Sequence, residues 1–285
     1  TLEPRLAMYF SSASSELRAL LTPALRQQLK ADHEAATVLC LKVGMPSCKE
    51  LREAMDVELY DKGLSAADLA TLGTLGSVLP ALVHLTLVES SEAAGHDGAE
   101  RLVEGLGAGA LPAVTLFALS DMYVGDAGAL ALAAALDRSA LPGLQTLQLL
   151  GTAIGDAGLV ALAPALRRRP ALDTLSLVDN PFGDEGLAAL LAPPPPAGAL
   201  TLPTGVLKKL KWLNLDDTHV TDAGCAALAA ALDSGALPAL KVLKLDGIPA
   251  SDAAKAAVYA ARANLGAESE DESEDGESED DEEGI

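Results

Sequence analysis

The segment LQTLQLLGTAIGDAG, residues 144–158, decides the fold. Leu147 and Leu149 alternate with other residues, a spacing typical of a short β-strand that buries one of its faces. Gly155 and Asp156 follow after a short turn, and aspartate is a preferred residue where a helix begins. The segment therefore predicts a strand, a turn and the start of a helix in succession.

This pattern recurs along the chain. Its other copies are LVHLTLVES from residue 82, VTLFALSDMYVGDAG from 114, LDTLSLVDNPFGDEG from 172, LKWLNLDDTHVTDAG from 210 and LKVLKLDGI from 240, with a degenerate copy, AMDVELYDKGLSAADLATL, from 54. The last leucines of the motif lie at residues 59, 87, 119, 149, 177, 215 and 245, so the spacing ranges from 28 to 38 residues. Repeats of this length predict an α/β solenoid with an inner parallel β-sheet, outer helices and about seven repeats.

The repeats resemble the ribonuclease-inhibitor type of leucine-rich repeat, whose unit reads L-x-x-L-x-L-x-x-N-x-I-G-D-x-G, over about residues 54–262. The resemblance implies a horseshoe-shaped leucine-rich repeat solenoid. The asparagine of that unit is present only at Asn180. The corresponding positions of other copies hold Ser90, Met122, Thr152, Thr218 and Ile248. We therefore expect a weakened ladder of hydrogen bonds at the turns.

The composition divides the chain into three parts. Residues 1–50 show helical leucine spacing and predict an N-terminal helical cap or the remnant of an upstream domain. Residues 51–266 form the leucine-rich repeat domain, interrupted by a proline-rich insertion at 192–205 that is either a stiff connector or a polyproline II ligand. Residues 267–285 hold 12 acidic residues and predict a disordered acidic C-terminal tail.

Charge and cysteine content limit the partners and the compartment. The net charge of −21 disfavours nucleic acid and anionic membranes, so we expect a protein partner with a basic surface. Three cysteines make a poor disulfide framework in a chain of 285 residues, and the N-terminus shows no secretory signal. The interpretation is an intracellular protein, cytoplasmic or nuclear, although what preceded Thr1 stays open.

The sequence gives no support for enzymatic chemistry. The four histidines, His33, His84, His96 and His219, lie in no recognisable catalytic motif, and we predict no catalytic residues. His33, Cys40 and Cys48 lack the paired short spacing of a zinc site, and no phosphate-binding glycine motif is present. We therefore expect no metal, no cofactor and a non-enzymatic interaction module.

An acidic tail after such repeats also resembles, more weakly, the GTPase-activating proteins of the Ran GTPase. That resemblance implies an alternative function, the regulation of a Ran-like small GTPase through an arginine on loops at one edge of the horseshoe. The early turns here contain no arginine, and Arg101, Arg138 and residues 167–169 fall on or after the expected helices. A weaker alternative is a histone or basic-protein chaperone that acts through the tail.

The expected concave surface carries an acidic edge. The second position after each L-x-L motif holds Asp61, Glu89, Asp121, Gly151, Asp179, Asp217 and Gly247. Neighbouring strands of a sheet lie about 4.8 Å apart, so the five acidic residues are expected in one column. The column is either a docking edge for a basic partner or a consequence of the preference of aspartate for such turns.

A basic cluster follows near the C-terminus. Lys208, Lys209, Lys211, Lys241 and Lys244 surround Trp212, the one tryptophan of the chain, and Asn214 is expected beside Lys244. An exposed tryptophan among lysines is typical of a binding hot spot, whereas a tryptophan packed at the edge would serve stability. Ser269 and Ser278 in the tail are each followed three residues later by an acidic residue, so both are predicted phosphorylation sites.

Overall fold

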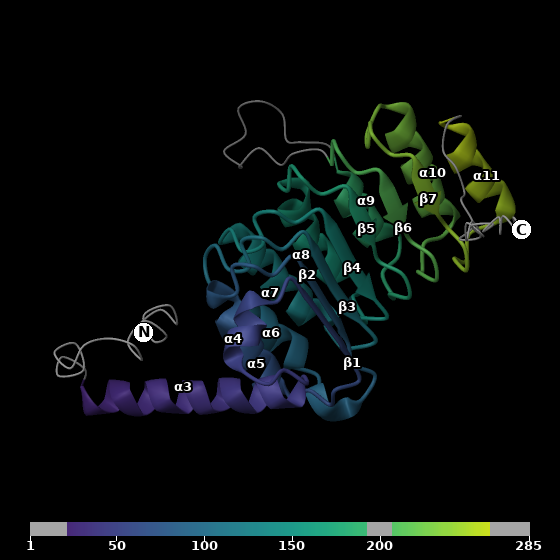
Figure 1. The fold of residues 1–285 in the computed structure, drawn as a ribbon. Coiled ribbons are helices and arrows are strands. Elements are labelled where there is room, and N and C mark those ends of the chain that lie inside the picture. The colour runs from purple at the N-terminus through teal and green to yellow at the C-terminus, as the bar shows by residue number, and fades with distance from the viewer. Residues whose placement is uncertain (1–21, 193–206, 263–285) are drawn as a thin grey trace, which may run out of the picture.

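The computed structural model describes residues 22–192 and 207–262, and Figure 1 shows their arrangement. The strands are β1 (Asp56–Tyr60), β2 (His84–Val88), β3 (Leu116–Ser120), β4 (Thr146–Leu150), β5 (Thr174–Ser176), β6 (Trp212–Asn214) and β7 (Val242–Lys244). The repeat helices are α5 (Ala66–Leu75), α6 (Gly98–Gly105), α7 (Gly125–Asp137), α8 (Asp156–Arg167), α9 (Asp184–Leu191), α10 (Asp222–Asp233) and α11 (Asp252–Ala260). Two short 3-10 helices, η1 (Gly76–Val78) and η2 (Glu92–Ala94), lie between α5 and α6.

The strands form one parallel sheet in the order β1 to β7, so each strand pairs with the strand of the next repeat. In the first four strands Leu59, Leu87, Leu119 and Leu149 are register partners. In the last four strands the partners are Leu147, Leu175, Leu213 and Leu243, which form a second leucine row. The predicted α/β leucine-rich repeat solenoid is confirmed.

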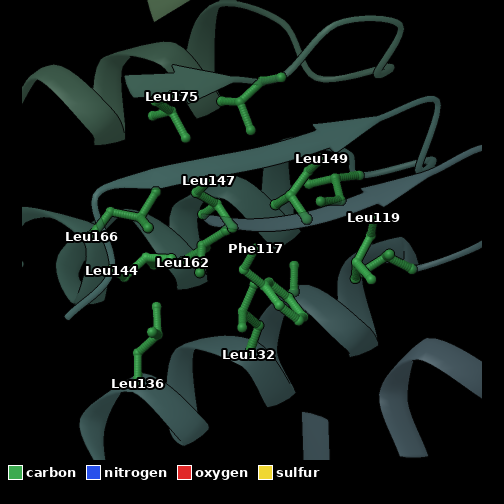
Figure 2. Packing of buried hydrophobic residues seen from close by; sticks show 14 of the residues in the cluster. Phe117, Leu119, Leu132, Leu136, Leu144, Leu147, Leu149, Leu162, Leu166 and Leu175 are labelled. Carbon is green, nitrogen blue, oxygen red and sulfur yellow. The ribbon is translucent and has the colours of Figure 1, made fainter. Parts of the chain in front are cut away.

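The core runs through the whole stack between the sheet and the helices. Figure 2 shows Phe117, Leu147 and Leu149 of the strands pointing toward Leu132 and Leu162 of the helices. All five side chains are fully buried. The alternating leucines of each strand are therefore the residues that pack against the helices. Each repeat depends on its neighbours to bury these side chains.

Small residues let successive helices approach closely. A Cβ added at Gly73 of α5 would lie 2.1 Å from the carbonyl oxygen of Leu102 in α6. A Cβ at Gly105 of α6 would lie 3.0 Å from the backbone of Gly73. The two helices thus touch backbone to backbone at this crossing, and a larger side chain there would push the first two repeats apart.

In the part of the chain that the structure describes, α3 (Pro23–Lys42) and α4 (Cys48–Glu53) precede the first strand. Most of the first half of α3 is exposed, whereas Leu39 and Cys40 near its end belong to the common core. Lys42 at the end of α3 pairs with Asp68 of α5 across 2.7 Å. The last turns of α3 are therefore attached to the first repeat.

One aspartate per repeat connects adjacent helices. We call these the helix-start aspartates: Asp126, Asp156, Asp184 and Asp222. Asp156 Oδ1 accepts hydrogen bonds from the backbone N–H groups of Gly183 and Gly186, at 2.9 and 2.7 Å, at the start of the next helix. Asp126 accepts from Gly155 and Gly158 in the same way. Each carboxylate thus satisfies N–H groups that the following helix leaves unpaired.

The asparagine retained from the family pattern also connects repeats. Asn180 Oδ1 accepts from Ile154 N–H at 2.9 Å and from the Thr152 hydroxyl at 3.0 Å, both in the preceding repeat. Its amide donates to the carbonyl of Leu149 at 2.7 Å. Thr218, at the equivalent position of the next repeat, donates to the carbonyl of Leu215 within its own repeat. The link that asparagine provides across repeats is thus observed at Asn180.

Candidate functional site

The sheet has one buried face and one open face. Along β1 exposed and buried residues alternate, and β2, β4 and β6 show the same alternation with partly exposed residues on the outer side. Figure 1 shows the repeat helices stacked along the other side of the sheet. The central residues of the strands are pairing partners and form a row on the open face: Glu58, Thr86, Ala118, Gln148, Ser176, Asn214 and Lys244.

This row is not evenly accessible. Ala118 is 1% exposed and Ser176 is 8% exposed, whereas Glu58 at the N-terminal end is exposed. Alanine and serine are the shortest side chains in the row, so longer neighbours on adjacent strands shield them. The accessible parts of the open face are thus toward its two ends and along the ends of its strands. Tyr60 of β1, 55% exposed, belongs to this face and was not predicted.

The acidic edge follows the ends of the strands. We call its residues the strand-exit column: Asp61, Asp121, Gly151, Asp179, Asp217 and Gly247. All six have a positive φ, between 47° and 68°, the left-handed region that glycine, asparagine and aspartate tolerate best. The backbone therefore explains the choice of aspartate or glycine at these positions. The four aspartates are exposed, so their carboxylates are also accessible to a partner.

Glu89 was expected to expose its carboxylate in this column, and it does not: its backbone follows β2 as predicted, but the side chain is buried. Its side chain is 3% exposed, and its carboxylate accepts hydrogen bonds from the N–H of Leu64 at 2.9 Å and from the hydroxyl of Ser91. Glutamate is longer than aspartate and reaches inward to the backbone of the preceding repeat. Glu89 is the one glutamate among the acidic residues predicted for the column. This difference in residue type could have indicated that its side chain lies elsewhere.

The carboxylates of the column lean toward neighbouring repeats. Asp61 Oδ1 accepts from the N–H of Ser90 at 3.0 Å and from its hydroxyl at 2.6 Å, and these hydrogen bonds lower the pKa of Asp61. A Cβ added at Gly151 would lie 3.1 Å from Asp121 Oδ1 and 3.5 Å from Asp179 Oδ2. Glycine at this position therefore leaves room for the two flanking carboxylates.

The predicted basic cluster is assembled on β6, β7 and the residues just before them. Lys244 Nζ lies 5.3 Å from the ring centroid of Trp212, within the range of a cation–π contact. Lys241 donates its N–H to the carbonyl of Lys211, which places these two residues side by side. Asn214 and Lys244 are strand partners, as expected. We call Lys211, Trp212, Asn214, Lys241 and Lys244 the lysine–tryptophan cluster.

The exposure of Trp212 is intermediate between the exposed and the packed tryptophan considered from the sequence. Its side chain is partly exposed, neither fully buried nor free in solvent. Lys211 Nζ pairs with Asp173 Oδ2 at 3.2 Å, so one lysine of the cluster is held beside the preceding repeat. Lys241 is exposed. The cluster thus combines a fixed aromatic ring with cationic groups at the accessible C-terminal end of the open face.

Several of the described arginines hydrogen-bond to carbonyl groups near helix ends. Arg138 donates to the carbonyl of Leu106 at 3.3 Å, and Arg169 donates to the carbonyl of Leu136 at the end of α7. Arg262 donates to the carbonyl of Ala236 at 2.9 Å, after α10. Arg101 pairs with Asp97 on its own helix. In residues 22–192 and 207–262, no arginine lies on the strand-exit column.

Several predictions fall outside the described residues. Ser269, Ser278 and the acidic tail lie there, as does the proline-rich insertion apart from Ala192. Among the residues that are described, no group of three or more His, Cys, Asp or Glu side chains is placed to hold a metal ion. The described helices include none that is long and apolar enough to cross a membrane.

The family comparison agrees with the repeats. A leucine-rich repeat model matches residues 142–163, 172–191 and 206–229. These three segments are similar in sequence to leucine-rich repeats. A comparison with curated proteins gave no match. The solved structures that match include an internalin from Listeria monocytogenes, with 13% sequence identity over 82% of this chain and 87% of that chain and a TM-score of 0.32. A leucine-rich repeat domain is consistent with a protein–protein interaction module.

Proposed function

We propose that the chain is a non-enzymatic module that binds a protein partner on the open face of its sheet. The observation that carries this proposal is the alternation of exposed and buried residues along the strands. Parallel sheets usually have both faces covered, so a stack of parallel strands with one accessible face is suited to receive a second protein. The three cysteines are free, and we place the module inside the cell, in the cytoplasm or the nucleus.

Charge favours a partner with a basic surface. Asp61, Asp121, Asp179 and Asp217 are exposed at one edge of the open face. The net charge of −21 adds a long-range attraction for basic proteins and a repulsion for phosphate backbones and anionic membranes. At the C-terminal end the lysine–tryptophan cluster offers the opposite charge and an aromatic anchor. The two features together define an orientation for the partner.

Site-specific photo-crosslinking tests the proposed face. A photo-reactive amino acid replaces Gln148 on the open face or, as the matched control, Val160 on the outer surface of α8, which is 39% exposed. We expect protein adducts from position 148 in a cell extract and none of the same mass from position 160. Adducts that form equally from both positions, or from 160 alone, would overturn the proposed face.

Charge substitutions test the partner chemistry on the protein identified by crosslinking. The double variant Asp121→Asn/Asp179→Asn is expected to slow association and to reduce its dependence on salt, because rim charges act mainly on the rate of association. The control Glu185→Gln/Asp233→Asn makes the same charge change at two exposed positions on α9 and α10. An equal effect of both double variants would show that only the net charge matters.

The alternative function, regulation of a small GTPase, requires a group that stabilises the charge of the transition state. The arginines described above hold helix ends or pair with aspartates, which favours the non-enzymatic module. Adding the full chain to a Ran-type GTPase and measuring GTP hydrolysis distinguishes the two functions. Stimulation of hydrolysis would overturn the non-enzymatic proposal. Binding of histones that disappears when residues 267–285 are deleted would instead support the chaperone alternative.

A further inference from the structure

Two of the three cysteines, Cys40 and Cys48, are in contact although they are eight positions apart in the sequence. Cys40 lies in the last turn of α3, and Cys48 is the first residue of α4. The chain reverses between them at Gly44, which has a φ of 83°, and the N–H of Met45 donates to the carbonyl of Cys40 at 2.8 Å. The Cys40 thiol donates a hydrogen bond to Cys48 Sγ, with the sulfurs 3.4 Å apart.

The two thiols differ in accessibility. Cys40 is 1% exposed and belongs to the core, whereas Cys48 is partly exposed. Burial, together with the hydrogen bond to Cys48, raises the pKa of the Cys40 thiol. A reagent in solvent therefore reaches the Cys48 thiol before the Cys40 thiol. The Cys40 thiol, with its raised pKa, stays protonated. Cys225, the third cysteine, is buried in α10 and provides an internal comparison.

We propose that Cys40 and Cys48 are a reversible oxidation site that exchanges with small-molecule disulfides of the glutathione class. The sulfurs need to approach by about 1.4 Å to reach the bond length of about 2.05 Å. The short connection through Gly44 and the partial exposure of Cys48 allow such a local movement at the start of α4, which is only six residues long.

The exchange has two steps. The Cys48 thiolate attacks one sulfur of glutathione disulfide, the disulfide bond of glutathione breaks, and one glutathione leaves as a thiolate that takes up a proton. The Cys40 sulfur then attacks Cys48 Sγ in the mixed disulfide, and the second glutathione leaves with the proton that Cys40 gives up. Overall, two protein thiols and one glutathione disulfide give one protein disulfide and two glutathione thiols.

The bond would fasten the N-terminal helices together. Cys40, Leu39 and Val43 of the α3 end and Leu51 of α4 all belong to the common core next to the first repeat. A disulfide would close the loop of residues 41–47 and restrict opening of this junction. We expect amide hydrogen exchange in residues 43–53 to become roughly tenfold slower or more in the oxidised chain.

The test uses the full chain in glutathione buffers from fully reduced to an excess of glutathione disulfide. Free thiols are then blocked in denaturant, and the intact mass and peptide map are measured. We expect two of the three thiols to be lost together, a Cys40–Cys48 peptide link, and full reversal by dithiothreitol. Cys225 should remain blockable. A dithiol that persists in excess glutathione disulfide, or a link that involves Cys225 or a second chain, would overturn the proposal.

Three variants sharpen the result. Cys225→Ser should oxidise like the unchanged chain. Cys40→Ser should stop at the glutathione adduct of Cys48, because the attacking sulfur of the second step is missing. Since serine at a buried position can prevent folding, Cys48→Ser provides a second measurement: neither adduct nor link should form at Cys40 in the folded chain. A glutathione adduct on Cys40 in that variant would contradict the proposed order of attack.

Discussion

Three repeats carry two aspartates five residues apart, Asp121/Asp126, Asp179/Asp184 and Asp217/Asp222, and the structure uses the two positions differently. In the strand-exit column Asp121 and Asp179 occupy left-handed backbone and are exposed. In the helix-start set Asp126 and Asp184 accept hydrogen bonds from the following repeat. A residue that recurs in a repeat can thus be fixed by its own backbone conformation or by a neighbouring unit. Asp121 and Asp179 bond to the next repeat through their backbone N–H groups, whereas Asp126 and Asp184 do so through their side-chain carboxylates.

The largest expected effect tests the register on which both aspartate positions depend. Leu149→Asp places a carboxylate at a fully buried position of the common core, and we expect the array to lose its folded structure. The control Gln148→Asp changes the adjacent residue on the open face and should retain a cooperative melt. Circular dichroism with urea titration measures both. A normal cooperative melt for Leu149→Asp would contradict the assigned strand register.

The second prediction separates the two aspartate positions directly. Asp156→Ala removes the acceptor for the N–H groups of Gly183 and Gly186, and should lower the free energy of unfolding by about 1–3 kcal/mol. Asp179→Asn keeps a residue that tolerates left-handed backbone, so we expect a change within about 0.5 kcal/mol. Urea denaturation measures both values. Equal losses would mean that the carboxylates of the strand-exit column also hold the stack together.

The third prediction concerns the glycine of the column. Gly151→Ala should cost about 1–2 kcal/mol, because alanine disfavours a φ of 58° and its Cβ would lie 3.1 Å from Asp121 Oδ1. Gly151→Asn is the matched variant, and it should cost less because asparagine tolerates this conformation. If alanine and asparagine cost the same, contact with Asp121 rather than backbone conformation sets the residue at this position.

The smallest effect is pH-dependent and concerns Asp216, directly before Asp217 of the column. Burial raises the pKa of Asp216, and the neighbouring Asp246 charge acts in the same direction. A carboxyl with a raised folded pKa favours folding when protonated, and this contribution is lost as pH rises through that pKa. We therefore expect Asp216→Asn to melt slightly higher than the unchanged chain at pH 7. The difference should vanish when the pH falls below the usual carboxyl range.

The pKa of Asp68 is shifted in the opposite direction to that of Asp216. Burial alone would raise the pKa of Asp68, but hydrogen bonds from Lys42 and Ser65 outweigh it and lower the pKa. A lowered carboxyl pKa stabilises the fold above the usual range, and the contribution is lost as pH falls through the folded value. Asp68→Asn should therefore melt lower at pH 7, and this difference should also close in acid. Thermal melts across pH 3 to 7 measure both variants.

The sequence was sufficient for the strands, their pairing partners and the central helix starts, because leucine alternation recurs along the chain and the Gly-Asp pattern recurs in the central units. It was insufficient for contacts between units. Asp156 was interpreted as a cap of its own helix, whereas it accepts from Gly183 and Gly186 one repeat later. A pattern that is identical in each unit does not tell which unit an acceptor serves.

The candidate site was predictable where register alone decides position. Asn214 and Lys244 were expected side by side and are strand partners. Glu89 was misplaced because side-chain length, rather than register, turned it inward. The contact of Cys40 with Cys48 had no signal in the sequence, since it depends on a chain reversal at Gly44 and on the packing of two helices against each other.

The helix-start hydrogen bonds all run in the same direction along the solenoid, from an acceptor in one repeat to donors in the next. Each aspartate is the acceptor, and its donors lie in the next repeat, as Asp222 shows with the N–H and hydroxyl groups of Ser251 at the last described junction. Deleting α11 from the C-terminal end would leave Asp222 exposed to water, where a carboxylate is well solvated. Deleting repeats from the N-terminal end up to Asp126 would instead strip the acceptor from Gly155 and Gly158. Shortening the protein should therefore be tolerated better from its C-terminal end than from its N-terminal end.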